Sequence, residues 1–308
     1  MKRLLLVILV VLGQATAAGA QSVQGHVADA ATGQAVPFVN IGVVGKDLGT
    51  VANEQGAYQL PFREALANDT VRVSSIGYRA RLLTLRALQA QPNVALTAAD
   101  VTLGEVQVQA KSLFRRTSTL GHTTNSTGSV VHLNNKSLGA EVGTVISLKR
   151  KPTRLLTAHF NVASNAVGPL VLRVNLYRLD RRGRPTDTKL LSHNLIVQSG
   201  ITHGTLDVDL TREQLVVDEN FFLALEWIKG DGAEAPTTLP PPLKTTVHQR
   251  SNGPAPPRTG LAFSAGAGYV DNDLYVRTTS QGAWERATVG ARLAGMQPYL
   301  SFFVTAQD

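Results

Sequence analysis

The most informative absence is cysteine, of which the 308 residues contain none. This excludes disulfide bonds, thiolate nucleophiles and cysteine-based metal sites. It also excludes the acylated cysteine by which a bacterial lipoprotein is anchored. A chain without disulfide bonds must reach its stability through packing alone.

Motifs of the common enzyme classes are also absent. No histidine is followed three residues later by glutamate, the spacing that a zinc carboxypeptidase uses to fix its metal. The segment Phe263–Gly266 lacks the first glycine of a serine-hydrolase elbow, and Gly42–Asp47 lacks the hydroxyl residue of a phosphate loop. The sequence therefore argues against catalysis, although it leaves the question open, and it indicates no cofactor and no metal.

The sequence has no apolar segment long enough to span a membrane, and its most prominent apolar run is a short one at the N-terminus. Lys2 and Arg3 precede an unbroken apolar run over Leu4–Leu12, and Ala18-Gly19-Ala20 follows as a small-residue cleavage site. This order is typical of a secretory signal, and a membrane span needs roughly 20 apolar residues. We expect residues 1–20 to be removed and the product to be exported to the periplasm or cell surface. An uncleaved membrane anchor is the alternative.

Acidic residues are outnumbered by basic ones, and the net charge is +8. Without Lys2 and Arg3, 28 basic residues face 22 acidic ones, a net charge of +6. This excess permits contact with anionic surfaces such as lipopolysaccharide or acidic glycans, and simple solubility explains it equally. Export argues against nucleic acid as a partner.

Residues 21–110 show the pattern of short strands separated by turns. Val23, Gly25 and Val27 alternate with polar residues, which predicts a half-buried strand. Asp29–Gly33 and Asn53–Gly56 are predicted turns, the second one a hairpin turn, and Gly33 and Gly56 suit positive φ. Further extended segments are expected at 36–41, 49–51, 58–60, 69–75, 79–85, 94–96 and 106–108. Helical turns are expected at 63–67 and 83–88.

The order and spacing of these pieces closely resemble one known family. The pieces include Val-x-Gly-x-Val from Val23, Asn53-Glu54-x-Gly56-x-Tyr58-x-Leu60 and Val73–Tyr78, and Leu103–Val108 resembles the closing strand of that family. The family is the carboxypeptidase regulatory-like, or transthyretin-like, domain of Bacteroidota exported proteins. The resemblance implies an accessory β-sandwich without catalytic residues of its own. In that family the domain often precedes a membrane receptor, but the remaining residues lack the regular strands of a large barrel.

The rest of the chain predicts a second, jelly-roll-like β-sandwich, so that the fold class is all-β. Residues 111–125 read as a linker and 126–308 as the domain, interrupted by a proline-rich loop at 235–258. Strands are predicted at 143–148, 155–163, 170–179, 190–197, 205–210, 221–228, 274–277, 287–291 and 299–305, and the segment 170–179 alternates well. Thr211 and Gln214 suit the capping box of one helical turn.

Ligand-binding candidates in the second domain are aromatic and acidic. Sugars stack on aromatic rings and bond to polar groups, so the candidates are Trp227, Trp284, Tyr269, Tyr275, Asp271 and Asp273. Both tryptophans also suit a core position, and Asp271-Asn272-Asp273 is a weak candidate for Ca²⁺. Glu226, inside an apolar strand, is expected to pair with a basic neighbour, or else to belong to a pair of glycosidase carboxylates.

These observations predict an exported, non-enzymatic binding or accessory protein of the cell envelope, which recognises a glycan or a partner protein. The alternative is a hydrolase of glycans or peptides with its site in the second domain.

Overall fold

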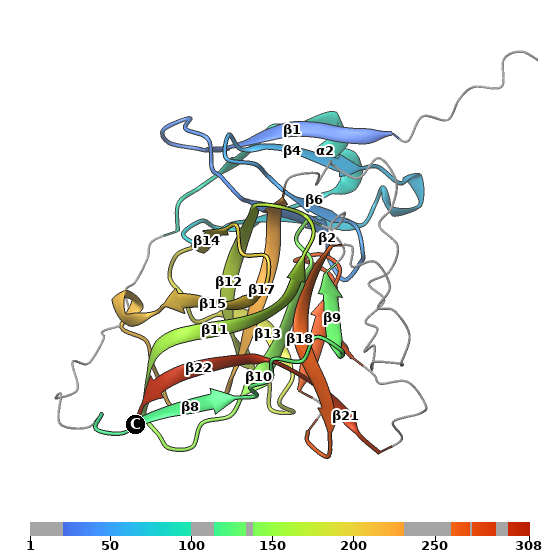
Figure 1. Ribbon diagram of the computed structural model, residues 1–308. Helices are drawn as coiled ribbons and strands as arrows, with labels where there is room; N and C mark the ends of the chain where they lie inside the picture. Colours follow the sequence, from blue (N-terminus) through green and yellow to red (C-terminus); the bar gives the residue numbers. More distant parts are fainter. Residues whose placement is uncertain (1–20, 100–113, 134–137, 231–259, 272, 288–294) are drawn as a thin grey trace, which may run out of the picture.

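The computed structural model describes residues 21–99, 114–133, 138–230, 260–271, 273–287 and 295–308. The expected signal at 1–20, the closing strand at 103–108, the proline-rich loop and Asn272 lie outside the described residues. No helix in the described ranges is long and apolar enough to cross a membrane. The chain is almost entirely β-structure, as predicted, and forms a small domain that lies on one end of a larger sandwich (Figure 1).

The first domain is a sandwich of a three-stranded sheet, in the order β4-β1-β7, and a four-stranded sheet, in the order β3-β2-β5-β6. Its elements are β1 (Ser22–Asp29), β2 (Asn40–Val43), β3 (Gly49–Val51), β4 (Ala57–Pro61), η1 (Glu64–Leu66), β5 (Thr70–Ser74), β6 (Arg81–Thr84), α2 (Leu85–Ala90) and β7 (Val94–Leu96). Val23, Gly25 and Val27 of β1 are buried, which confirms the predicted alternation.

The predicted turns occur where expected. Gly33 and Gly56 have φ of 70° and 74°, and the Asp29 carboxylate accepts hydrogen bonds from the backbone N–H groups of Ala31 and Thr32. The Tyr58 ring is buried and its hydroxyl donates to the Pro92 carbonyl at 2.6 Å. The local sequence therefore determines most of this domain.

Two local predictions for the first domain were wrong. The segment Asn53–Gly56 does not close a hairpin, because β3 belongs to the four-stranded sheet and β4 to the three-stranded one. The turn residues are those typical of a hairpin, but here they connect one sheet of the sandwich to the other. The second strand begins at Asn40 and not at Val36, because Phe38 lies in a turn with φ of 54°. The Phe38 ring packs against Val51 and against Ile228 of the second domain.

The second domain contains a seven-stranded sheet, β13-β12-β17-β10-β19-β20 with β14 on β12, and an eight-stranded sheet, β21-β18-β11-β22-β8 with β15 and β16 on β11 and β9 on β18. Its elements are β8 (Thr117–Gly121), β9 (Val130–Leu133), β10 (Glu141–Ile146), β11 (Thr153–Asn165), β12 (Leu170–Leu179), β13 (Pro185–Lys189), β14 (Leu195–Ser199), β15 (Gly204–Asp209), η3 (Thr211–Glu213), β16 (Val216–Val217), β17 (Phe221–Gly230), β18 (Leu261–Gly268), β19 (Leu274–Arg277), β20 (Glu285–Arg286), β21 (Gln297–Leu300) and β22 (Phe302–Gln307).

One boundary and one helix cap differ from the sequence prediction. The segment predicted as a linker, 111–125, contains β8, which pairs with β22, so the second domain begins before residue 126. The serine- and threonine-rich β8 reads as linker because it forms an edge of its sheet with little apolar patterning. The helical turn η3 has no side-chain cap from Thr211; instead the Asp209 carboxylate accepts from the Thr211 N–H.

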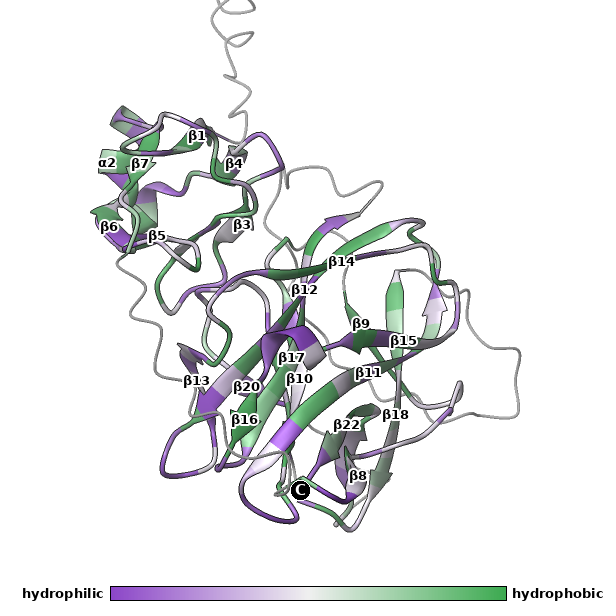
Figure 2. Cartoon of the chain, turned by 90° about the vertical axis from the view of Figure 1, so that its left-hand side faces the viewer, coloured by the Kyte–Doolittle hydropathy of each residue, from purple (hydrophilic) through white to green (hydrophobic). Residues whose placement is uncertain are grey.

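The main core lies between the two sheets of the second domain. Leu172, Val174 and Leu176 of β12 pack there with Leu223 and Leu225 of β17. Figure 2 shows apolar stretches along these strands. Strand alternation turns every second side chain of β12 and β17 to the opposite face of the sheet, away from this core. That outer face, which is also buried, contains the candidate site.

Candidate functional site

The outer face of the seven-stranded sheet carries a buried set of charged side chains. Glu141 and Glu226 lie directly opposite each other on β10 and β17, and both are fully buried. Arg173 on β12 and Arg277 on β19 flank them, exposed by only 2% and 3%. Buried charges are rare and persist where partners satisfy them, so each of the four depends on its neighbours.

Each carboxylate is held by its own arginine. Arg173 Nη1 donates to Glu226 Oε2 at 2.9 Å, which confirms the predicted pairing of Glu226 with a basic neighbour. Arg277 Nε donates to Glu141 Oε1 at 3.0 Å, and Tyr177 donates to Glu141 Oε2 at 2.8 Å. Asn175 Nδ2 bridges the pair, at 3.1 Å from Glu141 and 2.9 Å from Glu226.

The surroundings shift the pKa values of the two carboxyl groups in opposite directions. Burial raises the pKa of Glu141, and the charge of Glu226 adds to this rise against the opposing effect of Arg277. Burial also acts to raise the pKa of Glu226, but Arg173 and Lys189 outweigh it and the pKa is lowered. Glu226 is therefore the stronger acid of the pair.

Lys189 completes the charged set from β13. Its ammonium donates to Asn175 Oδ1 at 2.8 Å. Burial lowers the pKa of Lys189 to about 8, and the positive charges of Arg173 and Arg277 oppose the attraction of the two glutamates. A lysine kept in such surroundings is costly to the fold, and such residues concentrate at functional sites.

The first domain covers this outer face through its four-stranded sheet. Arg173 reaches across to donate to Asn40 Oδ1 at 3.0 Å and to the Phe38 carbonyl. The Gly45 N–H donates to the Gln281 carbonyl, and Asp47 accepts from Thr278. Apolar contacts join the same surfaces, where Phe38 and Val51 pack on Ile228 and the partly buried Leu138, Val171 and Ile196. The two domains are thus docked by polar and apolar contacts together.

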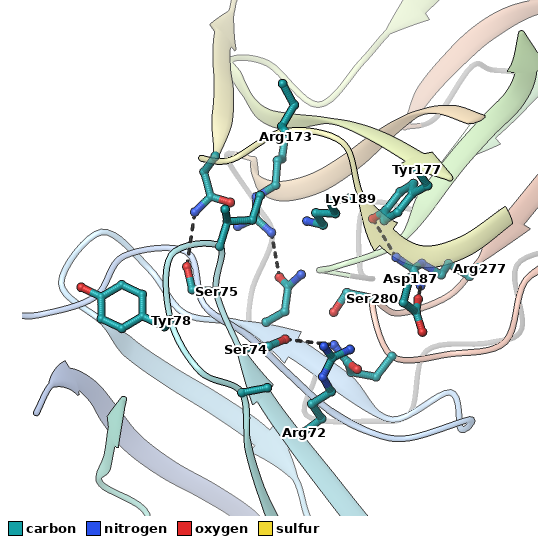
Figure 3. A pocket seen from close by; sticks show the side chains of 16 residues that line it. Arg72, Ser74, Ser75, Tyr78, Arg173, Tyr177, Asp187, Lys189, Arg277 and Ser280 are labelled. Atoms are coloured by element: carbon teal, nitrogen blue, oxygen red, sulfur yellow. Dashed lines mark hydrogen bonds and ion pairs between the residues drawn. The ribbon is translucent and has the colours of Figure 1, made fainter. Parts of the chain in front are cut away.

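A cavity of about 250 Å³ remains between the docked domains. The first domain contributes Asn40, Arg72, Ser74, Ser75, Ile76, Tyr78 and Ala80, and the second Arg173, Tyr177, Asp187, Lys189, Leu191, Asn194, Arg277, Ser280 and Gln281. Figure 3 shows Arg173, Lys189 and Arg277 approaching from the second domain and Arg72 from the first. Glu141 and Glu226 are not among the lining residues, because they lie behind the cationic side chains.

Sequence reasoning missed most of this site. The segment Ser74–Tyr78 had been identified only as part of a structural family pattern, yet four of its residues line the cavity. The alternation in 170–179 is a usable signal, since it places Arg173, Asn175 and Tyr177 together on one face. The sequence does not reveal that the same face is buried, because its cover comes from residues more than 100 positions away.

The predicted ligand residues are spread over three places. Trp227 is fully buried in the core between the sheets, so its ring offers no face to a ligand. Trp284 and Tyr275 both pack on Phe222 at the outer face, and the Arg277 guanidinium lies 4.2 Å from the centre of the Trp284 ring. Tyr269 is 83% exposed, and the structure does not join it to the other three aromatic residues.

The acidic candidates follow β18. Asp271 is exposed, and burial together with the charge of Asp271 raises the pKa of Asp273. Among the described residues, no three histidine, aspartate or glutamate side chains are grouped so as to hold a metal ion. Asn272, the middle residue of the Ca²⁺ candidate, lies outside those residues.

One further row of side chains has a chemically suggestive order. On the outer face of the eight-stranded sheet, His159 Nδ1 lies 2.7 Å from Asp207 Oδ1 and its Nε2 lies 2.8 Å from Thr305 Oγ1. A carboxylate–imidazole–hydroxyl row activates a nucleophile when donors for an oxyanion lie beside it. Here β11 pairs with β15 and β22 on either side, so the backbone N–H groups are engaged in the sheet and are not free to act as oxyanion donors. The His159 ring is also stacked on Phe303. The row therefore serves as a cross-strand polar contact.

Comparison with known proteins identifies a family for only the first part of the chain. No curated protein sequence matches it. Its likeness to solved structures is distant, as two examples show. The cysteine protease and lectin-like domains of Cwp84, a surface layer associated protein of Clostridium difficile, match with 9% identity and a TM-score of 0.39, over 84% of this chain and 46% of that one. The clostridial cysteine protease Cwp84 after propeptide cleavage matches with 11% identity and a TM-score of 0.35, over 84% and 51%.

The chain thus spans about half the length of these two structures, and a likeness this low does not extend to activity. A family model gives the firmer result. It matches residues 23–108, the segment whose strands and turns carry the resemblance described above. Its description is "CarboxypepD_reg-like domain", and the first domain of this chain is accordingly identified as a carboxypeptidase regulatory-like β-sandwich.

Proposed function

We propose that this chain is an exported, non-catalytic binding protein of the cell envelope, and that its ligand site is the cavity between the two domains. A regulatory-like first domain is compatible with an accessory binding role. In this proposal the first domain is one wall of the site, since Arg72, Ser74 and Ser75 line the cavity from that side.

The observation that carries the proposal is the layering of the charged groups. A hydrolase needs its acid and base within hydrogen-bond reach of the substrate. Here both candidate carboxylates lie behind arginines that use them as supports, whereas hydrogen-bonding groups of both domains face the cavity. Such a wall orients a polar ligand but keeps the two glutamates out of reach of it. The volume of about 250 Å³ suits a small polar unit, such as one sugar residue, better than the surface of a partner protein.

A glycan-array screen of residues 21–308, at physiological salt and with or without Ca²⁺, tests this proposal. The informative variant is Ala80→Trp, which places a large ring at the cavity wall, and Ala95→Trp on β7 is the matched control, because Ala95 is exposed and does not line the cavity. We expect defined sugars to bind, binding to be lost in the first variant, and the second variant to bind normally. Absence of binding, or equal binding by both variants, contradicts the proposal.

A second candidate function is supported by the opposite pKa shifts of Glu141 and Glu226. Enzymes separate the pKa values of two carboxyl groups in this way to obtain an acid and a base. Release of reducing sugar from glycans that bind on the array, abolished in a folded Glu141→Gln variant, would favour a hydrolase. Binding without turnover would favour the binding protein.

A further inference from the structure

The cavity wall contains cationic donors that the protein itself does not use. Arg72 lies on β5 and lines the cavity, and it has no hydrogen bond or ion pair to any residue that the structure describes. Lys189 uses one of its three ammonium hydrogens, on Asn175. Arg173 is 2% exposed, and its Nε has no partner within the described residues. Arg72 and Lys189 are only partly buried, whereas the Arg173 Nε is a buried donor without a partner, which is rare, so the three groups together point to a ligand.

Acceptors without protein partners line the same cavity. Asn194 donates from Nδ2 to Ser75 Oγ at 3.3 Å, but its Oδ1 is buried and accepts from none of the described residues. Asp187 accepts from Arg277 at 2.9 Å through Oδ1, and its side chain is 61% exposed, which leaves acceptor capacity. A matching ligand therefore carries hydroxyl donors in addition to an anionic group.

The balance of charge also favours an anion. Arg277 is neutralised by Glu141 and Asp187, and Glu226 pairs with Arg173. This leaves Arg72 and Lys189 as the charges without a carboxylate partner of their own. Ion pairs formed in such a partly enclosed space are screened by salt less than pairs on the open surface.

Resting on the function proposed above, we infer that the ligand of this cavity is a carboxylated sugar unit of the hexuronate type. Its carboxylate is received by Arg72 and Lys189, and its hydroxyls donate to Asn194 and Asp187. A peptide carboxylate fits less well, because only Ile76, Ala80 and Leu191 among the lining residues are apolar and no side-chain pocket accompanies the donors.

Binding of such an anion depends on pH through Lys189. The charged and titratable groups around Lys189 are Arg173 and Tyr177 on β12, Arg277 on β19, Glu226 on β17, Glu141 on β10, Asp187 on β13 and Arg72 on β5. Since the pKa of Lys189 is lowered to about 8, its positive charge is lost as the pH rises through that value. Affinity for the anion should therefore fall between pH 7 and pH 9, while any neutral ligand is much less affected.

Isothermal titration of the folded chain with glucuronate, galacturonate and their neutral parents glucose and galactose tests the inference. We expect a hexuronate to bind about tenfold or more tightly than its neutral parent, since one charge-assisted contact contributes on that order. Arg72→Gln should weaken hexuronate binding by about the same factor. Arg81→Gln on β6 is the control, because Arg81 is exposed and does not line the cavity.

The outcomes separate the inference from the proposed function. Neutral sugars that bind as well as hexuronates would overturn the charge preference and leave the cavity as a sugar site. Acetate or inorganic phosphate binding as tightly as hexuronate would show a simple anion site and overturn the sugar assignment, as would tighter binding of a short peptide through its C-terminal carboxylate. If no saccharide binds here or on the array, the proposed function itself fails.

Discussion

The two faces of the seven-stranded sheet are both buried, but by different means. The inner face, with Leu172, Val174 and Leu223, packs against the eight-stranded sheet of the same domain. The outer face, with Arg173 and Glu226, is covered by the first domain and by the segment that follows β19. Apolar packing on the inner face is non-directional and does not depend on specific pairs of residues. The outer face, in contrast, is stable only when each buried charge forms an ion pair or hydrogen bond with its partner. The site lies on the face that depends on partners.

The largest expected effect comes from removing one buried charge on the outer face. Glu226→Ala leaves Arg173 without its carboxylate, at 2.9 Å in the native protein, and should lower the free energy of unfolding by about 3–5 kcal/mol. Chemical denaturation measures the loss. The control is Glu219→Ala, whose 72% exposed side chain lies 3.9 Å from Arg178 and should contribute about 0–1 kcal/mol. Equal losses for the two variants would show that the buried pair has no special role.

A double variant sharpens this test. Arg173→Met combined with Glu226→Leu removes both charges of the pair, so neither partner is left alone in the interior. Its loss of stability should be smaller than that of Glu226→Ala alone, because the penalty arises from the orphaned charge. Ligand binding should nevertheless be lost, since Arg173 lines the cavity. If a folded double variant still binds the ligand, Arg173 does not contribute to the binding site.

On the inner face, truncation should act through packing. Leu223→Ala removes a fully buried side chain from the main core and should cost about 2–5 kcal/mol, depending on how far the core relaxes. The pKa of Glu226 is lowered in the folded protein, so the cost of Glu226→Ala should shrink as the pH falls below the ordinary glutamate value of 4.5. The cost of Leu223→Ala should stay constant over the same range, because leucine carries no titrating group. Denaturation curves at several pH values check this, and a pH-dependent cost would contradict the distinction between the two faces.

A smaller effect should appear in the pH dependence of stability. The pKa of Lys189 is lowered to about 8 in the folded protein, so between that value and its ordinary 10.5 the unfolded chain binds the proton and the folded chain does not. Stability from this group therefore rises as the pH increases through this window. The difference in unfolding free energy between the native chain and Lys189→Met, followed from pH 7 to pH 10, should move in favour of the native chain. A constant difference would contradict the lowered pKa of Lys189 in the folded protein.

The smallest effect is expected at the rim of the domain interface. Lys229 Nζ lies 3.2 Å from Glu54 Oε1, and both side chains are about half exposed, at 49% and 44%. Lys229→Ala should change the free energy of unfolding by about 0–1 kcal/mol, because solvent screens the pair. A larger loss by thermal denaturation would mean that the rim, and not Arg173 with Phe38 and Ile228, holds the domains together.

The sequence alone determined the all-β class and most of the first domain. Its turns depend on residues that act locally: Gly33 and Gly56 adopt positive φ without a steric penalty, and Asp29 bonds the backbone two and three residues ahead. The alternation in β12 likewise predicts a strand, because it depends only on the two-residue period of the backbone.

Only the tertiary structure decided where those strands turn and what they face. The turn at Asn53–Gly56 has the chemistry of a hairpin but crosses between sheets, and Phe38 leaves the extended conformation to pack on Ile228. Trp227 became core because its strand position faces the second sheet. The cavity brings Arg72 together with Lys189 and Arg277, which lie more than 100 residues away from it in the sequence. Burial and charge pairing of this kind are properties of the docked surfaces, which no local pattern encodes.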